Sequence, residues 1–301
     1  MSSPQDSIAS AHDRAGERSR LRVAIVLTAF ILLLEAAGGL YSNSLALLSD
    51  AGHVMTDLAG LLLCYAALAL ALRPATARKT YGWYRIEILA ALVNGALLFA
   101  LAVGIFLESV RRLQHPPTVL TLPMMLTAGL GLVVNVAAMT VLLRGRSNIN
   151  LRGALIHVFG DTLSSVGVLL TGALIMATGW TGADAVMGML IGVIIVVGAL
   201  RLLRDAVDVL LEATPAGIEL IRVADAISEI KGVRAVHDLH IWSITSGMPA
   251  LSGHVVIEDG AERSSDETLN RIKRMLHYRF SIGHSTLQIE SPDYQEFGEI
   301  H

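Results

Sequence analysis

Long apolar stretches alternate with short polar connections over the first two thirds of the chain. A helix needs about 20 predominantly apolar residues to cross the hydrocarbon core of a bilayer. On this basis we expect six membrane-spanning helices at residues 22–41, 45–72, 87–110, 119–143, 152–178 and 184–204. Residues 88–107 and 119–143 contain no charged side chain, so a bilayer is the natural solvent for this part of the chain.

Near residue 212 the pattern changes to that of a soluble domain. Alternating apolar positions predict strands, and apolar positions three or four apart predict helices. We expect, in chain order, a helix at Gly217–Lys231, strands at Ala235–Ile244 and Leu251–Glu258, a helix at Ser265–Arg279 and a strand at Ser285–Glu290. This αββαβ order predicts a small α+β domain with an antiparallel sheet and both helices on one face.

Positively charged residues indicate how the helices are oriented, because cytoplasmic connections carry an excess of Lys and Arg. Such residues fill the second and fourth connections and follow the sixth helix: Arg73, Arg78, Lys79, Arg85, Arg144, Arg146, Arg152, Arg201 and Arg204. Both termini are therefore expected in the cytoplasm, and the compact connections favour a bacterial inner membrane. The predicted organisation is a cytoplasmic segment over 1–20, a six-helix transmembrane domain over 21–211 and a cytoplasmic αββαβ domain over 212–301.

Composition excludes several classes of function. With 53% hydrophobic residues, 16% charged residues and a formal net charge of −3, the chain is not basic enough for a nucleic-acid partner. Its single cysteine excludes a disulfide framework or a cysteine-rich metal cluster within one chain. No glycine-rich phosphate loop followed by Lys-Ser or Lys-Thr occurs, so ATP is not expected as an energy source. We expect neither enzymatic activity nor an organic cofactor.

One spacing occurs twice in the apolar part of the chain, a histidine followed four residues later by an aspartate. His53 and Asp57 lie in the second predicted helix, and His157 and Asp161 lie in the fifth. Residues four apart share a helix face and stand roughly 6 Å apart along its axis. Two such helices side by side would supply four ligands to one metal ion. The alternative is that each histidine bonds its own aspartate and only ties helices together.

The ligand types indicate which ion such a site holds. Two imidazole nitrogens and two carboxylate oxygens suit tetrahedral Zn²⁺ or its relatives Cd²⁺ and Co²⁺, whereas Ca²⁺ and Mg²⁺ favour larger shells of oxygen. Histidine also exchanges protons near neutral pH, since its unperturbed pKa is about 6.5. We therefore expect His53 and His157 to carry the protons that are exchanged for metal. Glu35 has no matched partner, and either lines the ion path or makes an interhelical hydrogen bond.

Four further motifs accompany these residues. They are the segments Ser44–Ala51, Tyr81–Glu87, Leu211–Pro215 and Val236–Trp242, with sequences SLALLSDA, YGWYRIE, LEATP and VHDLHIW. Taken with the paired histidines and aspartates, the six expected helices and the soluble tail, these motifs resemble the cation diffusion facilitator family, in particular its zinc-transporting branch. The resemblance covers nearly the whole chain.

The resemblance implies a homodimer that exports cytosolic Zn²⁺ in exchange for H⁺ by alternating access. It also implies a tail with a metallochaperone-like fold that binds regulatory zinc. The matching tail positions are His237, His254 and Glu290, with His240 and His284 close in sequence. The first two fall on successive predicted strands and Glu290 falls on the third, so the sheet can gather them.

Two alternatives stay open. Relatives join the membrane and tail domains by ion pairs, so Arg85 is expected to pair with Asp205 or Asp208, although these are also ordinary charges flanking a helix. The protein could equally be a metal sensor or binding scaffold in the membrane, which would bind metal without moving it.

Overall fold

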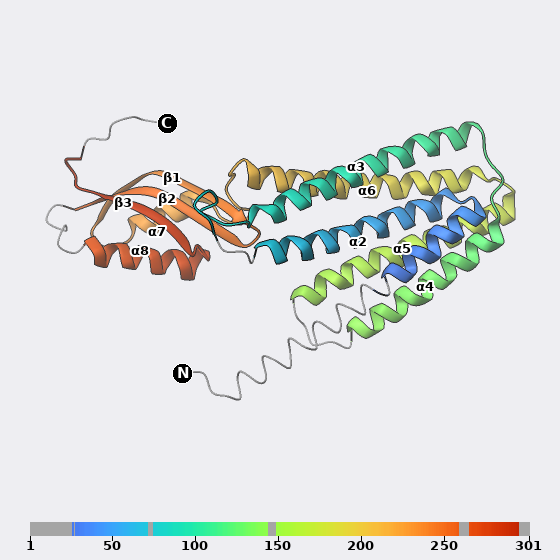
Figure 1. Cartoon of the computed structure of the whole chain (residues 1–301), viewed down its shortest axis with the longest axis horizontal. Helices are drawn as coiled ribbons and strands as arrows, with labels where there is room; N and C mark the ends of the chain where they lie inside the picture. Colours follow the sequence, from blue (N-terminus) through green and yellow to red (C-terminus); the bar gives the residue numbers. More distant parts are fainter. Residues whose placement is uncertain (1–25, 27, 72–74, 144–148, 259–264, 295–301) are drawn as a thin grey trace. The chain divides into compact units, whose positions relative to one another are not determined.

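The computed structural model describes residues 26, 28–71, 75–143, 149–258 and 265–294, and Figure 1 shows the arrangement of its helices and strands. The predicted N-terminal segment 1–20 lies outside the described residues. The first two thirds are helical. The helices are Thr28–Ser42, α2 (Leu45–Ala71), α3 (Arg85–Gln114), α4 (Thr121–Leu143), α5 (Ile149–Thr178) and α6 (Gly182–Leu210).

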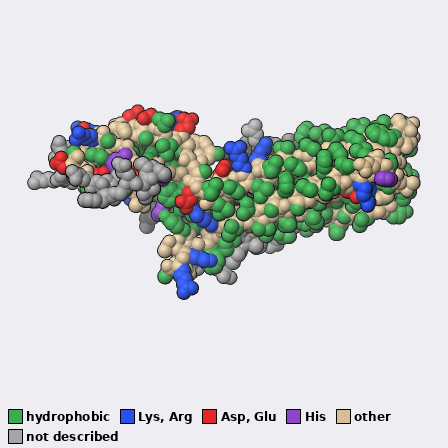
Figure 2. Space-filling view, turned by 90° about the horizontal axis from the view of Figure 1, so that it is seen from above, with side chains coloured by type: hydrophobic (Ala, Val, Ile, Leu, Met, Phe, Trp, Pro, Cys, Tyr) green, Lys and Arg blue, Asp and Glu red, His purple; other side chains and the backbone are tan. Residues whose placement is uncertain are grey.

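Four helical segments are long and apolar enough to cross a membrane among the described residues. They are Arg85–Gln114, Thr121–Thr140, Val158–Thr178 and Gly182–Leu210. Their outward faces carry large apolar side chains such as Leu126, Leu170 and Ile194, each more than half exposed. Figure 2 shows how hydrophobic side chains dominate the visible surface of the helices. Such a surface is stable only against lipid, so this part of the prediction is confirmed and the chain is a multi-pass membrane protein.

The start of α2 is held by side chains from distant parts of the chain. Ser44 caps the helix, because its Oγ accepts a hydrogen bond from Leu47 N at 3.2 Å. Asp184, at the start of α6, accepts hydrogen bonds from Ser44 Oγ and from the backbone N–H of Leu45. Arg112 of α3 donates to the carbonyl of Asn43 at 2.7 Å. Three helices therefore meet at a network of charged and capping groups.

Two compact units make up the chain, one over residues 1–62 and 94–201, the other over residues 63–93 and 202–301. Close helix contacts stabilise the first unit. Gly188 and Gly192 lie one turn apart on α6, and a side-chain carbon at these positions would lie 3.0 Å from Leu45 and 3.2 Å from Ile105. These two glycines let α6 approach α2 and α3 closely.

The second unit contains the soluble domain. Its elements are α7 (Leu220–Ser228), β1 (Val233–Thr245), β2 (Met248–Ile257), α8 (Ser265–Phe280) and β3 (His284–Glu290). They follow the predicted αββαβ order. Both helices contribute to one apolar core on the sheet, which contains Val223, Ile227, Val233, Ile241, Leu251, Val255, Ile272, Leu276 and Ile282.

The prediction of a fully antiparallel sheet is wrong. The sheet has the order β1-β2-β3, in which β1 and β2 pair antiparallel but β2 and β3 pair parallel. The β1–β2 connection is a tight hairpin, and Gly247 in it adopts a left-handed φ of 72°. The β2–β3 connection instead runs through α8, and such a crossover returns the chain in the same strand direction.

Candidate metal sites

The first candidate site lies on α2, where His53 and Asp57 stand one turn apart. His53 Nε2 lies 3.5 Å from Asp57 Oδ2, and both side chains are partly exposed at 30% and 25%. The i,i+4 spacing predicted from the sequence therefore brings the two ligand types together on one helix face. At this distance both groups can reach a single cation.

The second half of this site lies on α5. Asp161 belongs to this helix, and His157 is four residues earlier on it, but the side chain of His157 lies outside the described residues. A partly buried hydrogen bond joins the two helices, since Ser164 Oγ of α5 donates to Asp50 Oδ1 of α2 at 2.7 Å.

This hydrogen bond sets the levels of the two motifs along the helices. Asp50 precedes His53 by about one turn, and Ser164 follows Asp161 by about one turn. The two helices run in opposite directions, as Figure 1 shows. The motif on α2 and the motif on α5 therefore lie at matching levels. Asp50, which carries no ligand role in the prediction, positions the two helices by its bond to Ser164.

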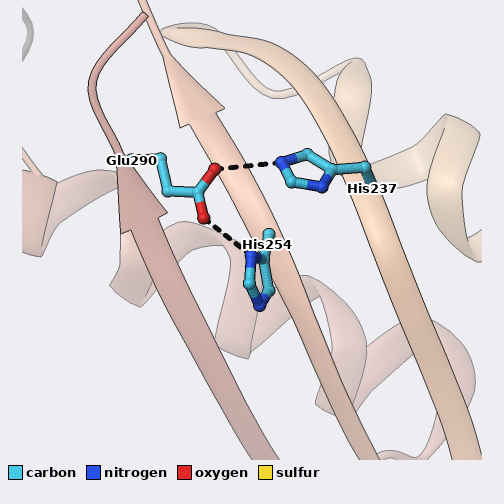
Figure 3. A group of neighbouring side chains, drawn as sticks. All are labelled: His237, His254 and Glu290. Carbon is cyan, nitrogen blue, oxygen red and sulfur yellow. Dashed lines mark hydrogen bonds and ion pairs between the residues drawn. The ribbon is translucent and has the colours of Figure 1, made fainter. Parts of the chain in front are cut away.

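The second candidate site lies on the sheet, with one residue from each strand. His237 of β1 and His254 of β2 are direct register partners, and Glu290 ends β3. His237 Nε2 lies 2.9 Å from Glu290 Oε2, and His254 Nδ1 lies 2.7 Å from Glu290 Oε1. One ligand atom from each residue lies within 4.8 Å of the others. Figure 3 shows the glutamate bridging the two imidazoles.

These three residues have the chemistry of a zinc site. Two imidazole nitrogens and a carboxylate leave a fourth tetrahedral position for water or another ligand. Glu290 is only 4% exposed, while His237 is 41% exposed, so the charge is buried and the cluster still opens to solvent. A buried carboxylate between two imidazoles is favourable when a cation or protons compensate its charge.

Two residues that support this cluster were not found from the sequence. Gln288 Nε2 donates to Glu290 Oε1 at 3.0 Å; residues two apart on a strand share a face, and that signal was available. Asp238 Oδ1 lies 2.9 Å from His240 Nε2, and Asp238 Oδ2 lies 3.9 Å from His254 Nε2. Asp238 has a left-handed φ of 47° at a shift in the β1 register, and no strand pattern predicts such an irregularity.

The other two predicted tail residues lie apart from the three-residue cluster. His240 contacts Asp238, as described above. His284 begins β3, where its register partner is Ala250, whereas Glu290 is at the opposite end of the same strand. The ring of His284 lies edge-on to that of Tyr81, with centroids 5.7 Å apart. Six residue steps of an extended strand, about 20 Å, separate His284 from Glu290.

The ion pair expected for Arg85 has a different partner. Arg85 Nη2 lies 2.6 Å from Glu212 Oε1, whereas Asp208 lies 3.8 Å from Arg204. The helix α6 ends at Leu210, and Glu212 then adopts a left-handed φ of 59°. This turn after α6 aims the carboxylate of Glu212 at α3. Close by in sequence, Thr245 Oγ1 donates to Glu87 Oε2 at 2.7 Å.

Comparisons with known proteins agree over almost the whole chain. The family model described as "Cation efflux transmembrane domain" matches residues 21–211, and the one described as "Cation efflux protein, cytoplasmic domain" matches residues 215–292. The metal cation efflux system protein CzcD of Cupriavidus metallidurans is 41% identical over 281 residues, which cover 93% of this chain and 89% of that protein.

The names of two further relatives state which metals they transport. The cadmium, cobalt and zinc/H(+)-K(+) antiporter of Bacillus subtilis is 37% identical to this chain, and the matched region covers 93% of this chain and 91% of the antiporter. The zinc transporter ZitB of Escherichia coli is 37% identical, with 90% and 87% covered. A solved structure, the metal-bound C-terminal domain of the CzcD transporter from Cupriavidus metallidurans, is 40% identical over 24% of this chain and 99% of that domain, at a TM-score of 0.23.

Proposed function

Because this chain belongs to the cation diffusion facilitator family of metal efflux transporters, we propose that it exports Zn²⁺ from the cytosol in exchange for H⁺. Cd²⁺ and Co²⁺ are proposed as further cargo. The names of the relatives support this range, because they include a zinc transporter and an antiporter of cadmium, cobalt and zinc.

The observation that carries the proposal is the matched position of the two ligand pairs. We propose that His53 and Asp57 of α2 and His157 and Asp161 of α5 bind one metal ion together. The 3.5 Å separation of His53 and Asp57 supports this role, as does the Asp50–Ser164 hydrogen bond between their helices. Four mixed nitrogen and oxygen ligands suit Zn²⁺.

The same ligands explain how exchange would work. An imidazole must lose its proton before it binds a metal ion, so binding at His53 and His157 releases protons. Return of protons from the far side then releases the metal. Asp57 and Asp161 keep a negative charge at the site, which makes the site attractive to a divalent cation throughout the cycle. A tight four-ligand site favours a slow carrier over a channel.

The remaining parts of the proposal concern organisation. We propose six transmembrane helices, both termini in the cytoplasm, and placement in a bacterial inner membrane. The proposed domain bounds are 1–20, 21–211 and 212–301. A homodimer is proposed because the family that matches residues 215–292 bears the name ZT_dimer. We further propose that His237, His254 and Glu290 bind a regulatory metal ion in the tail.

Metal flux into sealed proteoliposomes tests this function. The wild type is expected to move Zn²⁺ faster when an opposing pH gradient is imposed. His53→Asp and His157→Asp replace an imidazole by an oxygen ligand, so we expect the preference for Zn²⁺ over Mn²⁺ to weaken in both. Zn²⁺ binding with no flux at any gradient would instead support a metal sensor, the alternative that the tail cluster favours. Flux that ignores the gradient would exclude proton exchange.

A further inference from the structure

Glu35 is a buried carboxylate that the proposed transport site does not use. It lies on the helix Thr28–Ser42 and is 1% exposed, among the most buried side chains of the described residues. Its Oε2 atom has no hydrogen-bond partner in the part of the chain that the structure describes. An ionised carboxylate in such a place costs several kcal/mol unless a cation or donors compensate it. A bound cation or proton is therefore expected beside the Glu35 carboxylate.

The carboxyl group of Glu35 lies close to α4 at Gly131. The glycine makes room for this carboxyl group, since a side-chain carbon there would lie 3.2 Å from Glu35 Oε1 and 3.7 Å from Ser165 Oγ. Ser165 belongs to α5 and is 1% exposed. One turn beyond Gly131, α4 carries the buried residue Asn135. Glu35 and Ser165 thus place a carboxylate and a hydroxyl beside a position without a side chain.

The hydroxyl of Ser165 is not used elsewhere among the described residues. Threonine hydroxyls on α5 donate to the carbonyl four residues earlier, as Thr162 does to Val158 at 2.7 Å and Thr171 does to Gly167 at 2.9 Å. Ser165 Oγ instead has no hydrogen-bond partner within the described ranges. A buried hydroxyl normally finds a partner, so the Ser165 hydroxyl and the Glu35 carboxylate are two unsatisfied groups beside Gly131.

The chemistry of Glu35 and its neighbours indicates which cation can bind there. A divalent zinc-like ion is typically held by four ligands, whereas this position offers one carboxylate and one hydroxyl. An alkali ion needs more oxygen ligands than these two groups provide. A proton needs no coordination shell, and it neutralises a single carboxylate fully. A proton is therefore the cation that fits this position.

We propose that Glu35 is a proton-binding site of the transport cycle, distinct from the four metal ligands. This inference rests on the proposed exchange of metal for protons. The charged groups that act on Glu35 are Asp50 from α2 and Asp161 from α5, and α4 contributes no titratable residue. With the metal site empty, burial disfavours an ionised carboxylate at Glu35, and the negative charges nearby add to this effect. A divalent cation bound by Asp161 and its partners opposes that field, so metal entry expels the proton.

Counting the protons released when metal binds tests this role. Calorimetry of the full-length protein in buffers of different ionisation enthalpy gives the number of protons released per Zn²⁺ bound. We expect Glu35→Gln, which keeps shape and hydrogen-bonding capacity, to bind Zn²⁺ while releasing about one proton fewer than wild type. Glu35→Asp keeps the carboxyl group, and Asp205→Asn changes an exposed carboxylate. Both should release as many protons as wild type.

The outcomes separate this inference from the proposed function. If Glu35→Gln releases as many protons as wild type while wild-type flux follows the pH gradient, the role of Glu35 is wrong and the exchange stands. If wild-type flux does not depend on the pH gradient, the proposed exchange of metal for protons is wrong. The proposed role of Glu35 is then wrong as well. Should Glu35→Gln not fold, Gly131→Ala replaces it, because a side-chain carbon there would lie 3.2 Å from Glu35 Oε1 and crowd the carboxyl group. The pH dependence of its proton release should differ from that of wild type, and an unmoved profile overturns the role.

Discussion

Glu290 supplies the negative charge of the tail cluster, because its two oxygens meet His237 and His254 separately. Glu290→Gln keeps the shape and removes the charge that a divalent ion needs. We expect the affinity of the tail for Zn²⁺ to fall at least about 10-fold, which even supporting groups of metal sites contribute. Competition with a chromophoric chelator measures this in a chain whose helix site is disabled by Asp57→Asn and Asp161→Asn. Equal affinities would contradict the assignment.

The matched control for this substitution is Glu258→Gln, which changes an exposed carboxylate just beyond β2. It removes the same charge from the same domain without touching the cluster. Its affinity for Zn²⁺ should equal that of the unsubstituted tail, because exposed charges act weakly through water.

The two histidines of the cluster also predict how metal binding depends on pH. Each imidazole must be unprotonated to bind metal, so protons compete with the ion. Affinity should fall as the pH drops, with about two protons taken up per ion released in acid. In His237→Gln this number should fall to about one. An unchanged proton count in that variant would mean that His237 is no ligand.

At the scale of single residues, the sequence predicted which candidate ligands regular structure brings together. His53 and Asp57 follow from helical spacing, and His237 and His254 follow from facing positions on a hairpin. The partner of Arg85 could not be predicted, since it depends on the left-handed turn at Glu212. Such a turn at a non-glycine residue is set by its surroundings and leaves no local signal.

Among the elements, α8 helps to hold the sheet through its buried face. Its Leu276 is fully buried in the core with Leu251 and Val255. Leu276→Ala should cost about 2–5 kcal/mol, which corresponds to a rise of at least about 30-fold in amide exchange across β1 and β2. Hydrogen–deuterium exchange of the full-length protein measures this, and Tyr278→Ala, an exposed change on the same helix, is the control. Comparable exchange in both variants would refute the packing role.

The order of elements along the chain was predicted, but one strand direction was not. The strand predicted at Ala235–Ile244 became Val233–Thr245, so its period-two pattern was sufficient. The direction of β3 depends instead on where the α8 crossover returns the chain, which alternation along a strand cannot reveal. His284 was expected near the metal cluster because it is close in sequence, but it lies at the opposite end of β3 from Glu290 and packs on Tyr81.

For the whole molecule, the pair Arg85–Glu212 links the start of α3 to the segment after α6. Both side chains are exposed, at 42% and 58%, so the pair contributes at most about 1 kcal/mol. Arg85→Glu should therefore lower the rate of metal flux by less than about fivefold, with a smaller effect at high salt.

The double variant Arg85→Glu with Glu212→Arg should restore most of that loss, because it rebuilds the pair with reversed charges. Arg204→Glu alters the exposed pair with Asp208 and serves as the control. A double variant slower than both single variants would show that the two charges act separately on transport.

A last consequence concerns the irregularity at Asp238. Among the described residues the sheet has the order β1-β2-β3, so β1 and β3 are its edge strands, and an edge strand is a template on which another chain can add a strand. The register shift between His237 and His240 twists β1 just where charged Asp238 lies. The irregularity that orients the Asp238 carboxylate toward the histidines thus also disfavours the addition of another strand to β1. Two copies of this tail should therefore contact each other through side chains and not by extending one sheet.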